Sequence, residues 1–388
     1  MVNDRFDRPN KEINPHCSPK KRSTNNNFMK KYSSKIIGSG SVLPTIKKAN
    51  DAFWGNTFFN KSNELMTKTN PAITAKFEEV AGIVERRVAE PGIKASDLGA
   101  QAAKLAIEDA GIDPETLEYI IVAHNFGDVT SGTIQSDLLP NLAAKVKHKL
   151  GIKNSRCVAY DILFGCPSWV QAFIQANYYI QSGDVKRVLV VGADTVSRMT
   201  DPHDIDGMLF ADGGGAAILE AVEQTEETPK TGVLSHITVS DSLGEADYLK
   251  MGDSLKLETE GQYIRMYGKG VFRYAVTKVP DAMNECLEKA GLKLEDVDKF
   301  VMHQANMKMN KIILRRLYEL NGYKDYPEEM MPLVVHKLGN SSAATVPTVL
   351  DLIMKGVMDG HSINKGDIVI FASVGAGMHA NCIVYRHA

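Results

Sequence analysis

The sequence predicts an α/β fold made of two duplicated halves. In the 388-residue chain, short apolar segments typical of buried strands alternate with segments of helical periodicity. The strand expected at 119–122 recurs at 299–302, and an Ala-Gly-aliphatic tripeptide precedes it both times. The strand expected at 188–191 recurs at 368–371, at the same offset of 180 residues. Two matches at one offset favour an internal duplication over chance similarity.

The duplication sets the domain boundaries that we expect. Residues 1–28 contain three consecutive asparagines, three prolines and many charged side chains, which is typical of a disordered leader. They lack the apolar core of a signal peptide. We expect the first half to span 29–223 and the second half 231–388, joined by a charged and polar linker over 224–230.

Each expected element follows from its local pattern. Strands are expected where apolar residues run together, and helices where they recur every three or four positions. Ser96-Asp97 is the expected cap of a helix. The glycines at 213–215 open a strand, where they allow close backbone packing. The expected elements are a strand beginning at 35, a helix over 98–110, a strand over 119–124, a polar loop over 127–139, a helix over 142–150, strands over 158–164, 187–191 and 216–220, and a helix over 343–355.

Composition excludes several classes of protein. The formal net charge is −2, so no global field favours nucleic acid or a membrane surface. No apolar run approaches the length of a membrane span. The five cysteines are scattered and form no Cys-x-x-Cys pair, which indicates a reducing, cytoplasmic setting without a metal site.

The segment around Cys166 is the one on which the functional prediction depends. Residues 158–164 are expected to form a strand that Gly165 ends, and Pro167 suits the first turn of a helix. Cys166 therefore lies on a tight turn at the positive end of a helix. That end stabilises a thiolate by up to about 2 kcal/mol, which would lower the thiol pKa from about 8.5 towards 7. The alternative is a small buried side chain.

Two further side chains are expected to converge on Cys166. The repeat places the turn at 338–342 opposite the Cys166 turn, and His303 directly after the strand at 299–302. Taken singly, such a His or Asn is commonly structural. Together with Cys166, His303 and Asn340 make a nucleophile beside two hydrogen-bond donors. Because Asn cannot take up a proton, the trio favours stabilisation of an oxyanion or a thioester enolate over hydrolysis.

Five sequence blocks carry a resemblance to a known family. In spacing and order they resemble the signature blocks of β-ketoacyl-acyl-carrier-protein synthase III, and the resemblance covers roughly residues 33–388. The blocks are 161–166 (Asp-Ile-Leu-Phe-Gly-Cys), 200–202 with 210–217, 303–306 (His-Gln-Ala-Asn), 339–347 and 375–377 (Gly-Ala-Gly).

The resemblance implies a thiolase-like five-layer αβαβα fold, a homodimer and a ping-pong mechanism. Cys166 would take an acyl group from a thioester and release the carrier thiol. His303 and Asn340 would then stabilise the enolate of a second, carrier-bound acyl substrate, usually formed by decarboxylation of a malonyl group. The backbone N–H groups of Cys166 and Ala376 would form the oxyanion hole. No cofactor is implied beyond the phosphopantetheine that carries the substrates.

Three departures from the family pattern suggest a specialised relative. Ala376 stands where the family often has Gly, and a left-handed backbone would be more strained there. Lys76 stands where members that accept acyl-coenzyme A carry a tryptophan. The loop 127–139, which in the family shapes the partner's acyl pocket, is several residues longer than usual. One candidate is the ketosynthase that joins two β-ketoacyl chains into dialkylresorcinols; a housekeeping fatty-acid initiation synthase is the alternative.

The sequence also predicts an acyl carrier protein as the partner that delivers the substrate. Without a tryptophan at Lys76, a stacking contact with coenzyme A is lost, and Arg198, expected on the other side of the adenine, has no partner. Basic residues follow His303 on one expected helix face and would suit an acidic carrier. The predicted substrate-binding and carrier-binding residues are Gln304, Asn306, Arg198, Lys308, Lys311 and Arg315, with Arg316 alongside. Gln304 and Asn306 are expected to position either strands or the amides of pantetheine.

Other classes fit the sequence less well. A thiolase uses a second Cys, whereas Cys382 lies outside the resembling blocks, and an elongating synthase needs a His where Asn340 stands. Chalcone-synthase-like enzymes lack the His-Gln-Ala-Asn block. A non-catalytic chain-length factor or scaffold subunit usually loses the nucleophile, and Cys166 is retained.

Overall fold

The computed structural model describes residues 31–225 and 230–388. The predicted leader, 1–28, and residues 226–229 of the predicted linker lie outside the described residues. No helix in the described ranges is both long enough and apolar enough to cross a membrane.

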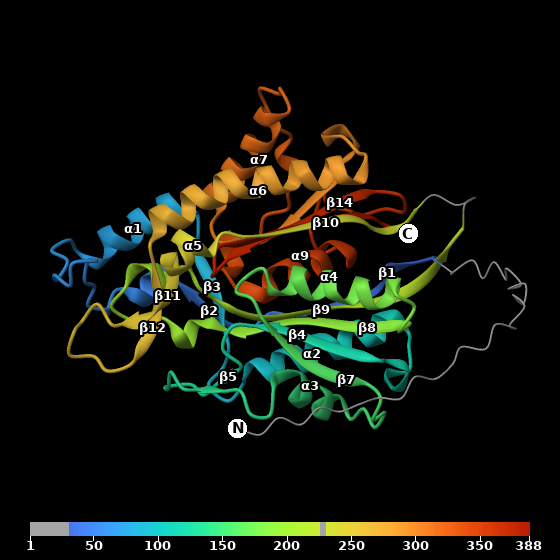
Figure 1. Cartoon of the computed structure of the whole chain (residues 1–388). Helices are drawn as coiled ribbons and strands as arrows, with labels where there is room; N and C mark the ends of the chain where they lie inside the picture. The colour runs from blue at the N-terminus through green and yellow to red at the C-terminus, as the bar shows by residue number, and fades with distance from the viewer. Residues whose placement is uncertain (1–30, 226–229) are drawn as a thin grey trace, which may run out of the picture. The chain divides into compact units, whose positions relative to one another are not determined.

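Two mixed sheets form the framework (Figure 1). In the first sheet β4 lies parallel to both β8 and β7, and β9 lies antiparallel to β8 and β1. The first sheet contains, in spatial order, β1 (Lys31–Val42), β9 (Asp212–Gln224), β8 (Arg187–Thr195), β4 (Tyr119–His124) and β7 (Val158–Leu163). In the second sheet β13 lies parallel to β14, and β15 is antiparallel to both of its neighbours. The second sheet contains β10 (Gly232–Ser240), β15 (His379–Arg386), β14 (Ile368–Gly375) and β13 (Lys299–Met302).

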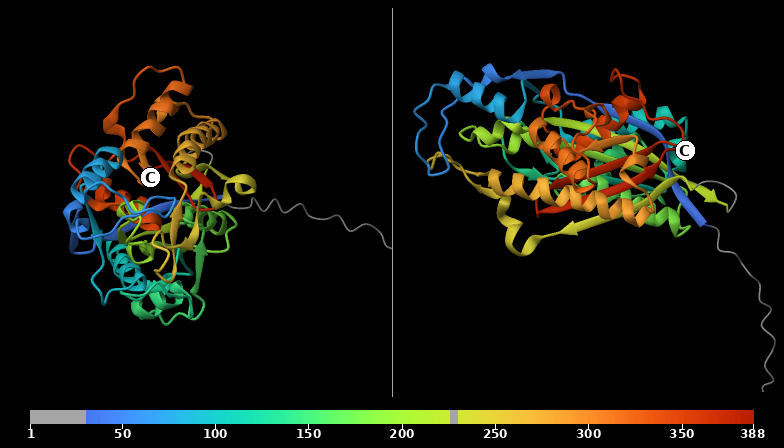
Figure 2. Two further views of the ribbon diagram at one scale, coloured as in Figure 1. Left: turned by 90° about the vertical axis from the view of Figure 1, so that its left-hand side faces the viewer. Right: turned by 90° about the horizontal axis from the view of Figure 1, so that it is seen from above.

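Helices complete five layers. Helices α2 (Ala95–Ala110) and α3 (Leu142–Leu150) pack on the outer face of the first sheet. Helices α4 (Ser168–Gln181) and α9 (Thr345–Met354) contact strands of both sheets and lie between them. On the far face of the second sheet lie α6 (Gly268–Ala290) and α7 (Met307–Leu320), as Figures 1 and 2 show. The predicted thiolase-like α/β fold is confirmed.

The repeat is visible in the topology. Strands β9, β8 and β4 have the same order and directions as β15, β14 and β13, and α4 occupies the place in the first half that α9 occupies in the second. The middle layer is the best-buried core, where Trp169 and Phe173 of α4 pack against Phe371 of β14 with ring centroids 6.2 and 5.8 Å apart. Helices that face two sheets bury most of their surface, which explains why apolar residues dominate α4 and α9.

Several element boundaries differ from the prediction, and those of α2 and β9 have a clear physical reason. Helix α2 begins at Ala95 rather than Leu98, because the Asp97 carboxylate accepts a hydrogen bond from the Lys94 N–H inside the first turn. The glycines at 213–215 lie within β9 and do not merely precede it. A Cβ on Gly214 would come within 2.5 Å of the Leu98 carbonyl oxygen, and one on Gly215 within 2.8 Å of Pro347. Glycine therefore lets α2 and α9 approach the two faces of one strand, as the expected close packing requires.

Smaller elements lie around the layers. Helix α1 (Asn70–Ala81) contacts α7, and two-stranded sheets are formed by β2 (Ile46–Ala49) with β3 (Glu85–Val88), and by β11 (Leu249–Asp253) with β12 (Gln262–Met266). The predicted polar loop 127–139 contains a third pair, β5 (Asp128–Val129) and β6 (Ser136–Asp137). Short helices α5 (Ser242–Glu245) and α8 (Val335–Leu338) lie on connecting segments.

Candidate active site

Cys166 lies on the turn between β7 and α4, directly against the β14–β15 connection. Gly165 adopts a left-handed backbone with φ 66°, and a Cβ there would lie 2.8 Å from the Ala376 nitrogen. A Cβ on Gly375 would in turn lie 2.7 Å from the Cys166 nitrogen. Only glycine fits at both positions, so the two turns touch backbone to backbone. The backbone nitrogens of Cys166 and Ala376 therefore belong to adjoining turns.

The backbone strain predicted for Ala376 is absent. Ala376 is outside the left-handed region, and the positive φ angles of this turn fall on Gly377 (79°) and Met378 (49°). The turn reverses one residue later than the prediction assumed, so the Cβ of Ala376 meets no backbone penalty.

The prediction of a lowered thiol pKa at Cys166 is also wrong. The side chain is buried, and desolvation raises the pKa of the thiol to about 11, while a hydrogen bond from Ser342 acts in the opposite direction. Burial favours the neutral thiol by more than the helix end favours the thiolate. The sequence could not show this, because the burying residues come from distant segments.

His303 and Asn340 lie where the repeat predicts. The His303 N–H donates to the Ala372 carbonyl, which fixes the residue at the end of β13 beside β14. The ring is buried, which lowers its pKa to about 4, and the Ser342 backbone counteracts this only in part. A ring with this pKa is neutral at neutral pH and can donate a hydrogen bond without carrying a charge.

Asn340 is held by backbone contacts to the other half. Its N–H donates to the Leu209 carbonyl at 3.0 Å, and its carbonyl accepts from the Ala211 N–H at 2.8 Å. The side-chain oxygen accepts from the Ser342 N–H at 2.9 Å. This contact orients the carboxamide and leaves its NH₂ group as the part that can donate to a ligand.

Two cavities meet at Cys166. One, of about 420 Å³, is also lined by His303, Asn340 and Asn306. The other, of about 280 Å³, is lined by Ala376 and by mostly apolar side chains that include Phe164. Cys166, Phe210 and Leu249 line both cavities. The structure thus brings the predicted trio together at one cavity and gives the thiol a second cavity on its other side.

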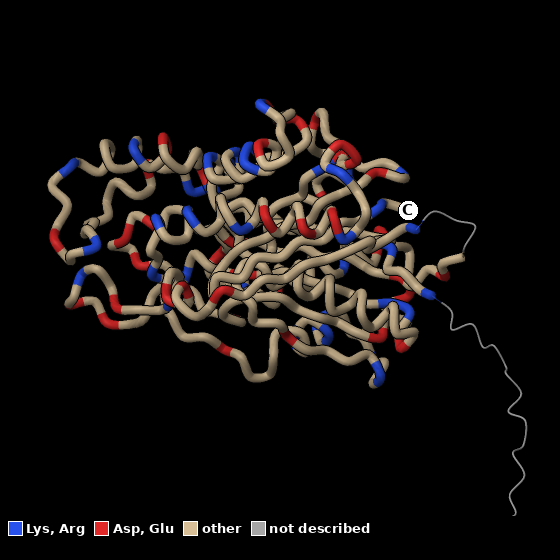
Figure 3. The backbone as a smooth tube through the Cα atoms, turned by 45° about the horizontal axis from the view of Figure 1, so that its top comes forward, with Lys and Arg blue, Asp and Glu red and all other residues tan. Residues whose placement is uncertain are grey.

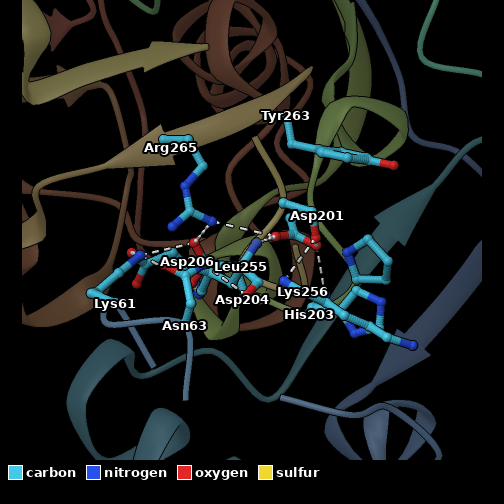
Figure 4. Close-up of polar contacts among 12 residues, drawn as sticks. Lys61, Asn63, Asp201, His203, Asp204, Asp206, Leu255, Lys256, Tyr263 and Arg265 are labelled. Atoms are coloured by element: carbon cyan, nitrogen blue, oxygen red, sulfur yellow. Dashed lines mark hydrogen bonds and ion pairs between the residues drawn. The ribbon is translucent and has the colours of Figure 1, made fainter. Parts of the chain in front are cut away.

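The β11–β12 hairpin lines both cavities, and a buried ion cluster anchors it (Figure 4). The Arg265 guanidinium on β12 lies 3.3 Å from Asp201 and 3.1 Å from Asp204. Asp201 also accepts hydrogen bonds from Ser254 and Leu255, just after β11. The cluster continues to Lys61, which contacts Asp204 at 2.8 Å and Asp206 at 2.6 Å. These contacts join the hairpin to the segment that precedes β9.

Replacing Arg265 by leucine is expected to destabilise the protein by about 3 kcal/mol, because the buried carboxylates of Asp201 and Asp204 would lose a cation. Thermal and urea unfolding midpoints measure the loss. Arg265→Lys is the matched control, since it keeps the charge and is expected to recover part of the stability. An Arg265→Leu protein as stable as the unchanged one would show that the ion cluster does not hold the hairpin.

Comparison with known proteins shows which family the chain belongs to. The chain matches the family models for 3-oxoacyl-[acyl-carrier-protein] synthase III over residues 160–240 and for its C-terminal part over 287–387. The β-ketoacyl-[acyl-carrier-protein] synthase III of Cereibacter sphaeroides is 35% identical over 307 residues, which cover 79% of this chain and 88% of that protein. The chain belongs to the β-ketoacyl-acyl-carrier-protein synthase III family. It is an acyltransferase of this type.

Further relatives agree with this assignment. The synthase III of Brucella melitensis is 33% identical over 352 residues, covering 90% of this chain and 98% of that protein. Among solved structures, the synthase III of Aquifex aeolicus has a TM-score of 0.73 at 28% identity, covering 91% of this chain and all of that one. The priming ketosynthase of the R1128 polyketide pathway has a TM-score of 0.73 at 26% identity, covering 92% and 97%. Xanthomonas campestris OleA shares the fold at 17% identity, with a TM-score of 0.71 and coverage of 92% and 98%.

Two of the predicted substrate-binding residues of this synthase III have side chains engaged by the protein's own backbone. The Gln304 side chain donates to the Pro332 carbonyl and accepts from the N–H groups of Val334 and Val335, so it holds a connecting segment and is fully buried. The Arg198 guanidinium donates to the carbonyls of three residues and lines neither cavity that contains Cys166. Those carbonyls belong to Glu90, Ile93 and Val129. Gln304 thus positions a connecting segment, and the edge of the Arg198 guanidinium is fixed by backbone groups from other segments.

The other predicted binding residues lie outside the cavities or at their edge. Asn306 caps α7 through its side-chain oxygen, which accepts from the Met309 N–H, and it lines the larger cavity. Lys308 is exposed near the start of α7. Lys311 is paired with Glu328 at 2.7 Å, and the Arg315 guanidinium lies over the Tyr326 ring, which reduces the positive charge of this face. The neighbouring Arg316 is exposed on the last part of the same helix and pairs with Glu319 at 3.5 Å.

Sequence reasoning missed four residues of the site. Lys269, at the start of α6, lines the larger cavity. Ser342 donates to the Cys166 sulfur at 3.1 Å, and Asn125 contacts Ser342 and Asp194 behind it. Ser342 belongs to the Asn340 turn and could have been singled out from its neighbour. Asn125 and Asp194 carry no signal in a single sequence, because only the parallel arrangement of β4 and β8 brings them together.

Proposed function

We propose that this synthase III forms a carbon–carbon bond by Claisen condensation on a Cys166-bound acyl group. The supporting observation is the meeting of two cavities at Cys166, one of which also contains His303 and Asn340. Cys166 attacks an acyl thioester, the oxyanion is stabilised by the N–H groups of Cys166 and Ala376, and the carrier thiol leaves with a proton. A second acyl thioester then forms an enolate by losing CO₂ from a malonyl group or the acidic C2 proton of a β-ketoacyl group to solvent. The enolate carbon attacks the carbonyl of the acyl-cysteine, the C–S bond breaks, and the Cys166 thiolate leaves and takes up a proton.

The two cavities suit different parts of the substrates. The smaller cavity, with Phe164, Leu163 and Ile264 among its lining residues, would hold the apolar acyl chain. The larger cavity would hold the phosphopantetheine arm, because it combines apolar residues with the amide of Asn306 and leads to His303 and Asn340. Since His303 is neutral, both residues act as uncharged donors to the enolate oxygen. The enolate is stabilised most when these donors are already in place.

We further propose that the acceptor is a β-ketoacyl thioester, as in dialkylresorcinol formation, rather than the malonyl carrier of fatty-acid initiation. The sequence departures at Lys76 and in the loop 127–139 motivate this choice. Acylated enzyme should be offered malonyl-carrier and β-ketoacyl-carrier in parallel, and the products identified by mass. Condensation with malonyl-carrier alone would assign the chain to fatty-acid initiation instead.

An acyl carrier protein is the proposed partner that delivers the acyl groups. Acidic and basic residues are interspersed over the described fold, so attraction of an acidic carrier needs a local basic surface (Figure 3). Lys269 in the larger cavity and exposed Lys308 supply positive charge on α6 and α7. Lys76, in the tryptophan position, is paired with Glu79 at 2.7 Å on α1 and offers no stacking surface.

Replacing Lys308 and Lys311 by Glu is expected to slow acylation by acyl-carrier about tenfold at low salt. Acylation by a small acyl thioester should change little, because electrostatic steering acts on the association of charged partners. Single-turnover acylation followed by intact mass measures both. The matched control reverses Lys104 and Lys149, which lie on α2 and α3 beyond the first sheet. Equal slowing with both donors, or equal slowing in the control, would contradict the carrier surface.

A homodimer is the proposed assembly. Strand β7 is an edge strand of the first sheet, and Val158 and Leu163 at its two ends are exposed. Leu139 in the nearby long loop is 89% exposed. An unpaired edge with exposed apolar side chains suits pairing with a second copy. Light scattering after size-exclusion chromatography is expected to show a dimer. The double variant Leu138→Glu, Leu139→Glu is expected to weaken this dimer. A monomer at micromolar concentration would contradict the proposal.

A further inference from the structure

The Cys166 thiol is the end of a chain of hydrogen bonds, Asp194–Asn125–Ser342, whose members come from three separate segments and whose middle residue, Asn125, is partly buried. Asp194 lies in β8, Asn125 directly follows β4, and Ser342 belongs to the turn before α9. Asp194 and Ser342 are both buried. Among residues 31–225 and 230–388, Ser342 provides the one side-chain hydrogen bond recorded to the Cys166 sulfur.

The donors and acceptors give this chain a direction. The Asn125 amide nitrogen lies 2.7 Å from Asp194 Oδ2 and 2.8 Å from Ser342 Oγ, so its two hydrogens are donated to these two atoms. The reverse amide orientation would set the Asn125 oxygen against the Asp194 carboxylate. Because Ser342 Oγ already accepts from Asn125, its single hydrogen is free to point at Cys166 Sγ, 3.1 Å away.

The carboxylate at the start of the chain is held in place from several sides. Asp194 also accepts from the backbone N–H groups of Asn125 at 2.9 Å and Ala343 at 3.3 Å. Burial raises the pKa of Asp194 to about 6, so the group is ionised at neutral pH and remains a strong acceptor for Asn125. Ser342 itself is held with φ 52°, a left-handed backbone that is uncommon for a residue with a Cβ. Such strain is retained where the surroundings require one orientation.

Other charged groups near Cys166 do not favour the thiolate in the same way. The Asp194 charge itself raises the thiol pKa, and His303 carries no charge at neutral pH. His124 on β4 has its two ring nitrogens engaged with Asp161 and the Gly127 N–H. The remaining charged side chains that line the two cavities are Lys250, Lys269 and Asp206. Beside the backbone hydrogen bond of Cys166 itself, the Ser342 hydroxyl is therefore the side-chain group in direct contact with the sulfur that can offset the burial of Cys166.

We propose that Ser342 and Asn125 are positioning residues for Cys166: Asp194 orients Asn125, Asn125 orients the Ser342 hydroxyl, and this hydroxyl donates to the sulfur and stabilises the thiolate. The inference rests on the proposed function only in taking Cys166 as the nucleophile. It assigns a role to side chains outside the predicted Cys-His-Asn trio. It also explains how the buried Cys166 thiol can ionise, although the positive end of α4 alone does not offset the cost of burying the thiolate.

Alkylation of Cys166 by iodoacetamide tests the inference without an acyl substrate. The sulfur displaces iodide and the thiol proton passes to the buffer, so the rate follows the thiolate fraction. Loss of a hydrogen bond to a charged group would raise the thiol pKa by about one unit, and since a more basic thiolate is also more nucleophilic, alkylation should slow about three- to tenfold. Intact mass between about pH 7 and 10 gives the rates, and Cys166→Ala defines the labelling of the other cysteines.

Two Ser342 variants separate the hydrogen bond from backbone strain. Ser342→Ala and Ser342→Gly both remove the hydroxyl, but glycine adopts φ 52° without penalty, so the Gly variant folds even if Ala is strained. Both should alkylate more slowly and shift the S–H stretching band of Cys166 in the infrared spectrum. Asn125→Ala should act in the same direction with a smaller effect. Ser341→Ala is the matched control, because the neighbouring hydroxyl faces Thr345 at 3.4 Å and should change neither reading.

The outcomes separate the inference from the proposed function. Unchanged alkylation and an unchanged S–H band in both Ser342 variants would overturn it, and so would equal slowing in Ser341→Ala, which would indicate a packing effect. Either result leaves the assignment of Cys166 intact, because that depends on the acyl adduct. Loss of the acyl adduct on Cys166 with the alkylation shifts preserved would instead overturn the condensing function and leave the chain of hydrogen bonds standing.

Discussion

Replacing Cys166 by alanine is expected to abolish both the covalent acyl adduct and turnover. Cys166 is the cysteine at which both cavities meet, and its turn is fitted backbone to backbone against the turn of Ala376. Without a sulfur there is no acceptor for the acyl group, so the loss should be complete rather than partial. Intact mass after incubation with an acyl donor detects the adduct, and product formation is assayed separately.

Cys157→Ala is the matched control for this experiment. Cys157 is also a buried free cysteine, but it lines neither cavity that contains Cys166. Its replacement should leave the adduct and the turnover unchanged. An adduct that persists in Cys166→Ala would move the nucleophile to another cysteine, and the absence of any adduct on the unchanged protein would favour the non-catalytic scaffold subunit.

Replacing Asn340 by alanine is expected to separate the two half-reactions. Acylation of Cys166 should continue, while condensation falls by about 10²–10³, the usual effect of removing one donor to a developing oxyanion. His303→Ala should behave similarly, because His303 and Asn340 both line the larger cavity, whereas Ala376 lines the smaller one. Pre-acylated enzyme mixed with the acceptor thioester measures condensation alone.

Asn340→Asp sharpens this test. The aspartate keeps an oxygen that can accept from the Ser342 N–H, so the turn retains the contact now made by Asn340, but the NH₂ donor is lost. Condensation should therefore remain as low as in Asn340→Ala. Recovery of condensation in the Asp variant would mean that Asn340 acts by supporting the turn. Equal loss of both half-reactions in the Ala variant would mean that its role is not confined to the enolate.

Much of the fold could be predicted because it depends on local patterns. Apolar runs mark the strands, and the helix over 142–150 has the predicted bounds. The repeat at an offset of 180 residues placed the Asn340 turn opposite the Cys166 turn and His303 at the end of a strand. The cavity that joins all three follows from this symmetry, since equivalent turns of a duplicated fold lie on opposite sides of one axis.

The sequence by itself therefore determined the fold class and the family and pointed to three side chains that line one cavity, whereas the tertiary structure decided what surrounds each side chain. Local periodicity shows where a residue lies along an element but not which distant groups surround it. Gln304 and Arg198 donate to backbone carbonyls from remote segments, which no local pattern shows. Burial by both halves raises the pKa of Cys166 instead of lowering it. The Ser342 hydroxyl donates to the sulfur and Asn125 donates to Ser342 only because β4, β8 and the Asn340 turn meet in space.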